Sequence, residues 1–201
     1  MKNYSGKKIW LIGASVGIGA ALAKELADEG AILALSARDI EKLNELKNSL
    51  IGNNHLLFQL DVTNTDKVEK AANEINAAFG NIDCVIFMAA SYQAHTNAGL
   101  CDINTAKHIM DVNFNGAMNV VHAALPFLKS SANSQLILCG SVAGYRGLPS
   151  GQPYCASKAA LINYAESLRV ELPEIDVKLI SPGFVKTRLT DKNDFKMPFI
   201  I

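Results

Sequence analysis

Tyr154 and Lys158 carry the residue types for proton transfer, and they lie four positions apart in a segment that opens at Pro153. This spacing places both side chains on one face of a helix. A free tyrosine titrates at about pH 10, and bringing its pKa to about 7 takes roughly 4 kcal/mol. A neighbouring ammonium supplies part of this by stabilising the phenolate. Tyr154 can then exchange a proton with a carbonyl or alcohol oxygen.

Ser141 precedes this pair, directly after a predicted strand, Leu136–Cys139. Ligands of an open parallel sheet bind at the carboxyl ends of its strands. The Ser141 hydroxyl is therefore predicted to hold the same substrate oxygen. Taken alone, a Tyr-x-x-x-Lys pair is more simply explained as two neighbours on a helix surface, so the argument depends on the motifs that accompany it.

A glycine-rich turn, Gly13-Ala14-Ser15-Val16-Gly17-Ile18-Gly19, follows the first predicted strand. It is related to the dinucleotide-binding fingerprint G-x-G-x-x-G but has a different spacing. Gly13 allows a sharp turn, and we expect Gly17 and Gly19 to remove Cβ atoms where the backbone approaches a pyrophosphate. The helix N-terminus that follows offers free N–H groups and partial positive charge. The simpler alternative is a tight turn that binds no ligand.

The second predicted strand ends in Ala37 and Arg38. Dinucleotide sites carry an acidic residue at this place for the ribose 2′-hydroxyl, whereas a 2′-phosphate is bound by arginine. Ala37 stands where the carboxylate is expected, and the Arg38 guanidinium can form charge-assisted bonds to a phosphate. The pair favours NADP(H) over NAD(H). The alternative is a solvated arginine near a helix start.

Apolar runs of strand length alternate with amphipathic helical patterns. The predicted strands are Lys8–Ile12, Ile32–Leu35, His55–Gln59, Cys84–Met88, Leu136–Cys139 and Val177–Ile180. The clearest helix has Val68, Ala72, Ile75 and Phe79 on one face, with Thr63 or Thr65 as its N-cap. Apolar strands alternating with helices indicate right-handed crossovers in a parallel sheet buried on both faces. We predict one doubly wound α/β domain over residues 1–201, a Rossmann fold.

The composition excludes several classes of protein. Nineteen Lys and Arg balance nineteen Asp and Glu, which argues against a general nucleic-acid binder. Hydrophobic residues make up 49% of the chain and charged residues 19%, which favours a large core over disorder. The longest apolar run, Cys84–Ala90, is too short to span a bilayer. The N-terminal segment is too short and too glycine-broken for a signal peptide.

The cysteines and histidines predict neither disulfides nor a metal site. No C-x-x-C pair occurs among Cys84, Cys101, Cys139 and Cys155, so we expect reduced thiols and a cytoplasmic location. His108 and His122 fall on one predicted helix, about 21 Å apart. Cys155 is interpreted as a small buried core thiol. The loop after the fourth strand is interpreted as a surface loop, although it can line a cleft; it carries Ser91, Tyr92, Gln93 and His95.

Together these motifs resemble the short-chain dehydrogenase/reductase family from the first strand to Leu189. The matching pieces are, in order, Gly13-x-x-x-Gly17-x-Gly19, Asp61-Val62-Thr63, Asn113, Ser141, Tyr154-x-x-x-Lys158 and Pro182-Gly183-Phe184-Val185-x-Thr187. The resemblance implies a catalytic tetrad of Asn113, Ser141, Tyr154 and Lys158. It implies that Lys158 also holds the nicotinamide ribose and that Asn113 helps position a proton-relay water. The implied cofactor contacts are Gly13, Ser15, Gly17, Ile18, Gly19, Arg38, Asp61, Val62, Ala89, Tyr154, Lys158, Val185 and Thr187.

The leading hypothesis is therefore an oxidoreductase that transfers a hydride between NADP(H) and a small carbonyl or alcohol substrate. In it, Tyr154 is the acid/base, and a positively charged nicotinamide ring assists Lys158 in lowering its pKa. One alternative is a cofactor-binding but catalytically silent protein that acts through partners. A sugar epimerase or dehydratase shares Tyr-x-x-x-Lys but usually needs a larger C-terminal region.

Three departures from the family pattern stand out. Phe87-Met88-Ala89-Ala90 replaces the usual N-N-A-G, so we expect apolar packing in place of the asparagine that ties neighbouring strands, and Ala90 adds a methyl group where the backbone passes the cofactor. Ile12 replaces the usual threonine before the first glycine. The sequence stops at Ile201, where relatives usually continue. We expect either a truncated chain or an unusually short substrate lid and sheet edge.

We also expect a homodimer or homotetramer. Relatives commonly pair through the outward faces of two long helices, here around Thr105–Lys129 and Pro153–Glu171. Apolar or small residues are available on these helices at Val120, Val121, Ala124, Leu128, Ala159, Ile162 and Ala165. The alternative is that these side chains only thicken the core of one chain.

Overall fold

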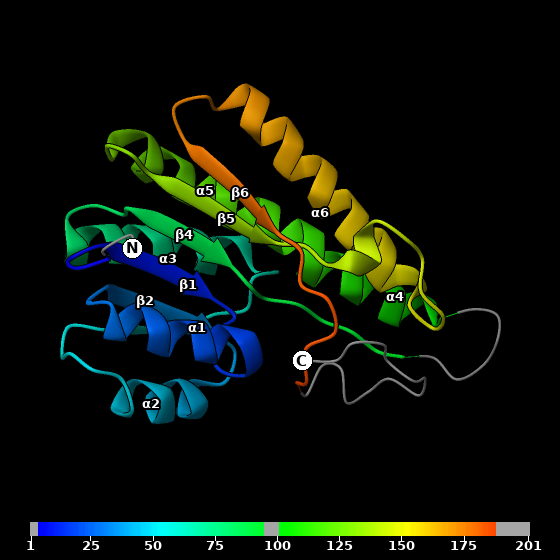
Figure 1. The fold of residues 1–201 in the computed structure, drawn as a ribbon, viewed down its shortest axis with the longest axis horizontal. Coiled ribbons are helices and arrows are strands. Elements are labelled where there is room, and N and C mark those ends of the chain that lie inside the picture. The colour runs from blue at the N-terminus through cyan, green and yellow to red at the C-terminus, as the bar shows by residue number, and fades with distance from the viewer. Residues whose placement is uncertain (1–3, 95–100, 188–201) are drawn as a thin grey trace.

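A six-stranded parallel sheet forms the centre of the molecule. The computed structural model describes residues 4–94 and 101–187. The strands are β1 (Lys8–Ile12), β2 (Ile32–Ala37), β3 (Leu56–Gln59), β4 (Cys84–Phe87), β5 (Gln135–Cys139) and β6 (Asp176–Ile180). They pair in the order β3-β2-β1-β4-β5-β6, and every pair is parallel. This confirms the predicted doubly wound fold, and the arrowheads in Figure 1 point to a shared edge of the sheet.

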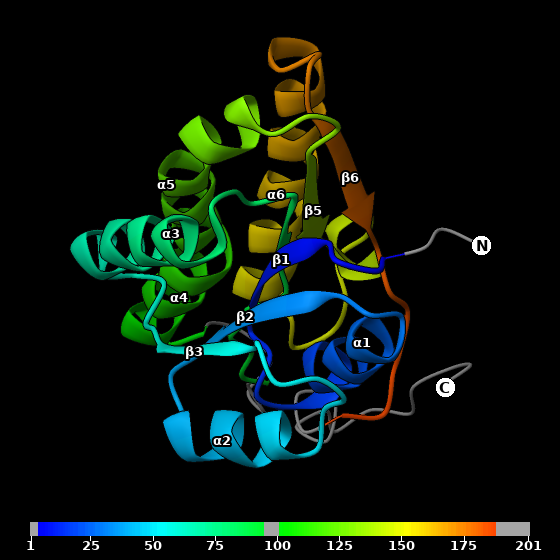
Figure 2. The same cartoon turned by 90° about the vertical axis from the view of Figure 1, so that its left-hand side faces the viewer.

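Helices cover both faces of this sheet (Figure 2). They are α1 (Gly17–Asp28), α2 (Ile40–Asn48), α3 (Thr65–Phe79), α4 (Ile103–Met110), α5 (Gly116–Ser130) and α6 (Gln152–Glu171). Alternate residues of each strand face opposite sides, so Ile9 and Leu11 pack with α1 and α2, whereas Trp10 and Ile12 pack with α3, α5 and α6. Two buried apolar layers thus hold the sheet in place. Among the described residues, none of the helices is both long and apolar enough to cross a membrane.

The predicted strands agree with the observed strands to within two residues at each end. The predicted N-cap of α3 was wrong. Asn64 caps this helix, because its side chain accepts a hydrogen bond from the backbone N–H of Lys67 at 3.0 Å. Thr63 instead donates to Asp61 Oδ1 through both its backbone N–H and its hydroxyl.

The predicted long helix around Thr105–Lys129 is interrupted. A π-helical segment, Asp111–Asn115, joins α4 to α5 and contains the buried Asn113. Such segments widen one helical turn and occur frequently at functional sites. Directly after it, a Cβ on Gly116 would lie only 2.5 Å from Val62 Cγ2, so glycine lets α5 pack tightly against the segment that follows β3.

The side chains chosen for a dimer interface are buried within one chain. Val120, Val121, Ala124 and Leu128 belong to the core cluster under the sheet, and Ile162 and Ala165 are buried as well. Of the proposed set, only Ala159 is exposed. The prediction of an interface built on these residues was therefore wrong, because α3 and the sheet already cover the apolar stripe of α5. Self-association itself stays a prediction.

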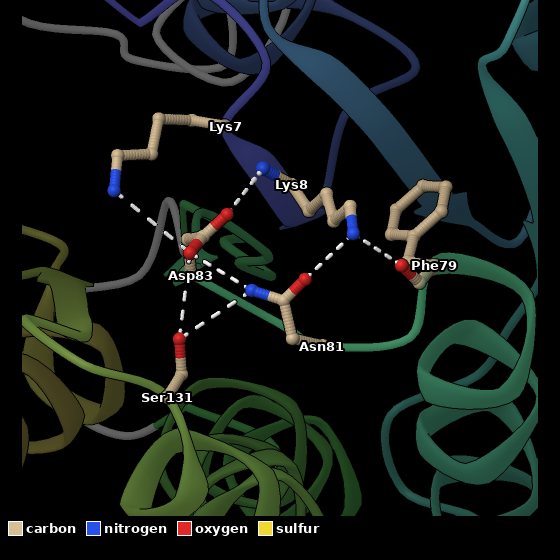
Figure 3. A network of polar contacts seen from close by, with 6 residues as sticks. All are labelled: Lys7, Lys8, Phe79, Asn81, Asp83 and Ser131. Atoms are coloured by element: carbon tan, nitrogen blue, oxygen red, sulfur yellow. Dashed lines mark hydrogen bonds and ion pairs between the residues drawn. The ribbon is translucent and has the colours of Figure 1, made fainter.

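A polar network ties the elements together at the amino ends of the strands (Figure 3). The Asp83 carboxylate accepts hydrogen bonds from the backbone N–H of Lys8 at 2.8 Å and from Asn81 Nδ2 at 2.9 Å. The Lys8 ammonium binds Asn81 Oδ1 at 2.7 Å and the Phe79 carbonyl at the end of α3. The Ser131 hydroxyl reaches Asp83 at 3.4 Å. This network fixes the starts of β1 and β4 to the ends of α3 and α5.

Candidate active site

A continuous cleft of about 720 Å³ runs along the carboxyl ends of the strands. Segments that follow each of the six strands line it. Fourteen of the fifteen predicted site residues are among its lining residues: Gly13, Ser15, Gly17, Ile18, Gly19, Arg38, Asp61, Val62, Ala89, Ser141, Tyr154, Lys158, Val185 and Thr187. Asn113 is the exception, because it is buried behind the wall of the cleft.

The glycines of the turn after β1 are required by the packing of the protein itself. Gly13 has φ +85°, and a Cβ there would lie 2.6 Å from the backbone nitrogen of Ala89. A Cβ on Gly19 would lie 2.2 Å from the Gly13 carbonyl oxygen. The turn therefore needs glycine at position 19 before any ligand is considered, and the expected approach of this backbone to a pyrophosphate stays a prediction.

The N-terminus of α1 differs from those of the next three helices. Asp39, Asn64 and Asp102 each accept a backbone hydrogen bond as the N-cap of α2, α3 and α4. The N-cap of α1 is Val16, whose side chain cannot accept one. The first N–H groups of α1 therefore face the cleft without a side-chain cap, in the arrangement that suits a bound phosphate.

Three charged side chains gather where the cleft passes β2 and α2. Arg38 is exposed at the end of β2, and its carbonyl accepts a hydrogen bond from Gln59 at 3.0 Å. Lys42, in the first turn of α2, also lines the cleft and pairs with the Asp39 carboxylate. That pairing lowers the pKa of Asp39. Sequence reasoning identified Arg38 and missed Lys42, whose available signal is its position three residues after Asp39, the N-cap of α2.

Ser141 and Tyr154 meet at the other end of the cleft. Ser141 follows β5, and Tyr154 lies in the first turn of α6. Burial raises the pKa of Tyr154 to about 12, and a hydrogen bond with the Ser141 side chain opposes this rise. The hydroxyl of Tyr154 is therefore protonated at neutral pH in the protein alone.

The Lys158 ammonium is buried and hydrogen-bonded to a backbone carbonyl. Its Nζ donates to the Cys139 carbonyl at 2.6 Å and lies 5.8 Å from the ring centroid of Tyr154. Burial lowers the pKa of Lys158. In the protein alone, desolvation of the phenol is the largest effect on the pKa of Tyr154. The expected lowering of this pKa towards 7 requires Lys158 together with a positively charged nicotinamide ring, and it stays a prediction.

Asn113 connects two parts of the site. Its Oδ1 accepts from the backbone N–H of Ser91 at 2.6 Å, and its Nδ2 donates to the Ser91 carbonyl at 3.0 Å. The same Nδ2 donates to the Ser157 hydroxyl at 2.9 Å, which in turn donates to the Tyr154 carbonyl at 2.7 Å. Sequence reasoning missed Ser157, whose signal is its position three residues after Tyr154. The implied role of Asn113 towards a relay water stays a prediction.

The position of Tyr92 shows that the segment after β4 is not simply a surface loop. Its side chain is only 7% exposed, lines the cleft and packs edge-on against the Tyr154 ring. His95 lies outside the described residues. The remaining wall at this end of the cleft is largely apolar and is formed by Val142, Leu148, Pro149, Cys155 and Phe184.

Two further expectations have clear outcomes. Phe87 is fully buried in the core, and Met88 donates its backbone N–H to the Ile12 carbonyl at 2.8 Å, so apolar packing and a backbone bond hold the strands here. Cys155 is half-buried and lines the cleft, where its Sγ accepts from the backbone N–H of Leu148 at 3.4 Å. It is therefore not the buried core thiol expected. No cluster of three metal-ligating side chains occurs in residues 4–94 and 101–187.

The sequence of the chain is similar to those of known proteins. The family model described as short chain dehydrogenase matches residues 7–197. An Arabidopsis thaliana protein named 11-beta-hydroxysteroid dehydrogenase 1A is 33% identical over 198 residues, covering 96% of this chain and 56% of the relative. The chain thus spans just over half the length of that relative. An uncharacterised oxidoreductase of Myxococcus xanthus is 34% identical, covering all of this chain and 81% of the relative.

Solved structures share the fold. A short chain dehydrogenase from Burkholderia cenocepacia in complex with NADP matches with a TM-score of 0.87 and 27% identity, covering 94% of this chain and 78% of that one. A short chain dehydrogenase from Salmonella enterica matches with a TM-score of 0.91 and 25% identity, covering 98% and 86%. With a family match over nearly its whole length, the chain belongs to the short-chain dehydrogenase family.

Proposed function

We propose that this chain binds NADP(H) and reduces a carbonyl group on a neutral, largely apolar substrate. The observation that carries the proposal is one cleft that joins Arg38 and Lys42 at one end to Ser141, Tyr154 and Lys158 at the other. The glycine turn and the N-terminus of α1 lie between these ends. The Burkholderia structure with NADP supports the choice of cofactor.

The cleft fits the cofactor in both size and charge. Its volume of about 720 Å³ lies in the range of small-molecule and cofactor sites. The uncapped N-terminus of α1 suits the pyrophosphate, and Arg38 with Lys42 suits the 2′-phosphate. Asp61 and Val62 would contact the adenine, and Val185 and Thr187 the nicotinamide amide. When bound, NADPH supplies the hydride for the carbonyl carbon.

The protein supplies the proton and the residues that position the proton donor. Tyr154 donates its hydroxyl proton to the developing alkoxide oxygen, and Ser141 donates a hydrogen bond to the same oxygen. Because the raised pKa keeps Tyr154 protonated at neutral pH, its resting state suits reduction. Lys158 would stabilise the phenolate once the proton has left and would also hold the nicotinamide ribose. Asn113 holds the backbone of Tyr154 through Ser157.

The wall at the substrate end supports an apolar substrate. Tyr92, Val142, Leu148, Pro149 and Phe184 present apolar surface beside Ser141 and Tyr154. Among the described residues there, Lys158 is the one charged side chain, and it is committed to Cys139 and Tyr154. The name of the plant relatives, hydroxysteroid dehydrogenase, agrees with a lipophilic substrate class.

The test is a panel of paired ketones and aldehydes of similar size, one neutral and one carrying a carboxylate in each pair. NADPH consumption is followed at neutral pH. We expect turnover with the neutral members and weak or no turnover with the charged ones. NADPH binding without consumption on any member would instead support a catalytically silent, cofactor-binding protein.

A further inference from the structure

We propose that Tyr92 is a positioning residue for Tyr154: its ring braces the ring of the acid/base tyrosine and so sets where the hydroxyl points in the cleft. This inference rests on the proposed function of Tyr154. Tyr92 follows β4 and reaches the site from a segment distant in sequence from α6.

The contact between the two rings is specific. The ring centroids of Tyr92 and Tyr154 lie 5.2 Å apart, and the ring planes meet at 72°. This edge-to-face arrangement is the one that aromatic pairs prefer. Both residues line the cleft, and Tyr92 is almost fully buried. Packing therefore holds the Tyr92 side chain in the wall of the cleft.

The backbone beside Tyr92 is fixed by a tetrad residue. Asn113 binds both the N–H and the carbonyl of Ser91, the residue directly before Tyr92. Through Ser157, Asn113 also holds the carbonyl of Tyr154. The buried Asn113 amide thus holds two segments in place. One is the segment that carries the Tyr92 ring, and the other is the backbone of Tyr154.

The other contacts of Tyr154 leave this role open. Lys158 Nζ lies 5.8 Å from the ring centroid and is directed to the Cys139 carbonyl, and Ser141 contacts the hydroxyl rather than the ring. The Tyr92 ring is the aromatic partner that limits rotation of the phenol. A misplacement of about 1 Å in a catalytic group costs about 100-fold in rate, so loss of this brace should lower turnover.

A second aromatic pair provides the matched control. Phe114 and Tyr164 also meet edge-to-face, with centroids 5.9 Å apart and planes at 82°. Tyr164 lies on α6, as Tyr154 does, but it does not line the cleft. Tyr164→Leu therefore removes the same kind of ring contact from the same helix, at a residue that does not line the cleft.

Kinetics give the first test. In Tyr92→Leu we expect kcat to fall about 10- to 100-fold while the Kd for NADPH changes less than about twofold. Tyr92→Phe, which keeps the ring, should restore most of kcat. Tyr164→Leu should keep the kcat of the unaltered protein. Equal kcat in Tyr92→Leu and the unaltered protein overturns the proposal, as does a loss of kcat in Tyr164→Leu as large as that in Tyr92→Leu.

A measurement without turnover separates this inference from the proposed function. Ring-labelled tyrosine gives NMR signals whose Tyr154 component is assigned with Tyr154→Phe. We expect Tyr92→Leu to shift the Tyr154 ring signals and to move its titration midpoint to lower pH, since water then reaches the phenol. Tyr164→Leu should leave both unchanged. Unchanged Tyr154 signals in folded Tyr92→Leu reject the brace, even if the chain reduces no carbonyl at all.

Discussion

The Lys158 ammonium lies 5.8 Å from the ring centroid of Tyr154 while its Nζ donates a 2.6 Å hydrogen bond to the Cys139 carbonyl. The strand β5 therefore holds the charge beside the phenol by a backbone group, not by a carboxylate that would neutralise it. Burial keeps the phenol protonated in the protein alone. In the proposed reduction, the ammonium would stabilise the anion that forms when the proton leaves. In the proposed reduction, this protonated resting state suits Tyr154 as the proton donor.

Cofactor preference is the first prediction. Arg38→Ala should remove roughly 1.5–3 kcal/mol of the preference for NADPH over NADH, the usual strength of hydrogen bonds to a charged group. Lys42→Met should weaken NADPH binding as well, because it also leaves the Asp39 carboxylate unneutralised beside the 2′-phosphate. Calorimetric titration of both cofactors measures the two effects.

Lys47→Met is the control for this experiment, because it removes one positive charge from the same helix without altering the cleft. Its NADPH affinity should equal that of the unaltered protein. Equal affinities of the unaltered protein for NADPH and NADH would reject the assignment of Arg38.

The raised pKa of Tyr154 predicts an alkaline loss of stability. The folded protein keeps the phenol neutral up to about pH 12, whereas the unfolded chain ionises it at about pH 10. The stabilising contribution is therefore complete below about pH 10 and is lost as the pH rises through about 12. In Tyr154→Phe the fall in unfolding free energy over this window should be shallower, as measured by urea denaturation.

The exposed Tyr145 provides the comparison, and Tyr145→Phe should keep the slope of the unaltered protein. A slope in Tyr154→Phe that equals both of the others would show that burial does not perturb this phenol.

The glycine turn gives a prediction about folding. Gly19→Ala places a methyl group 2.2 Å from the Gly13 carbonyl oxygen. Because this oxygen belongs to the backbone, it cannot move away as the end of a flexible side chain could. We expect a loss of roughly 1–3 kcal/mol in unfolding free energy, as for other overpacked sites. Gly147→Ala is the matched control, since its Cβ would meet nothing within 4 Å. A stability of Gly19→Ala equal to that of Gly147→Ala would contradict the packing of this turn.

The sheet was predictable because each strand is a short apolar run between turn signals, and Lys8–Ile12 was placed to the residue. The turn at Gly13 and the pair Tyr154 and Lys158 were predictable because local spacing determines them. Contacts between distant segments were not predictable. Nothing in the sequence near Tyr92 indicates that its ring contacts Tyr154 on α6. The bond from Asn113 to Ser91 depends likewise on how the π-helical segment packs.

Two properties could not be read from the sequence, for the same physical reason. An apolar stripe such as Val120 and Val121 shows that something covers a helix, but not whether a second chain or the same chain does so. In the same way, the pKa of Tyr154 depends on burial, which the spacing to Lys158 does not report.

The central claim is that Tyr154 donates the proton in an NADPH-dependent carbonyl reduction, and Tyr154→Phe tests it most directly. The substitution keeps the ring and removes the transferable proton. Turnover of a neutral ketone and the Kd for NADPH are measured side by side with the unaltered protein. The account predicts a fall in kcat of about two to four powers of ten with an NADPH affinity that hardly changes. Full activity in Tyr154→Phe would contradict it.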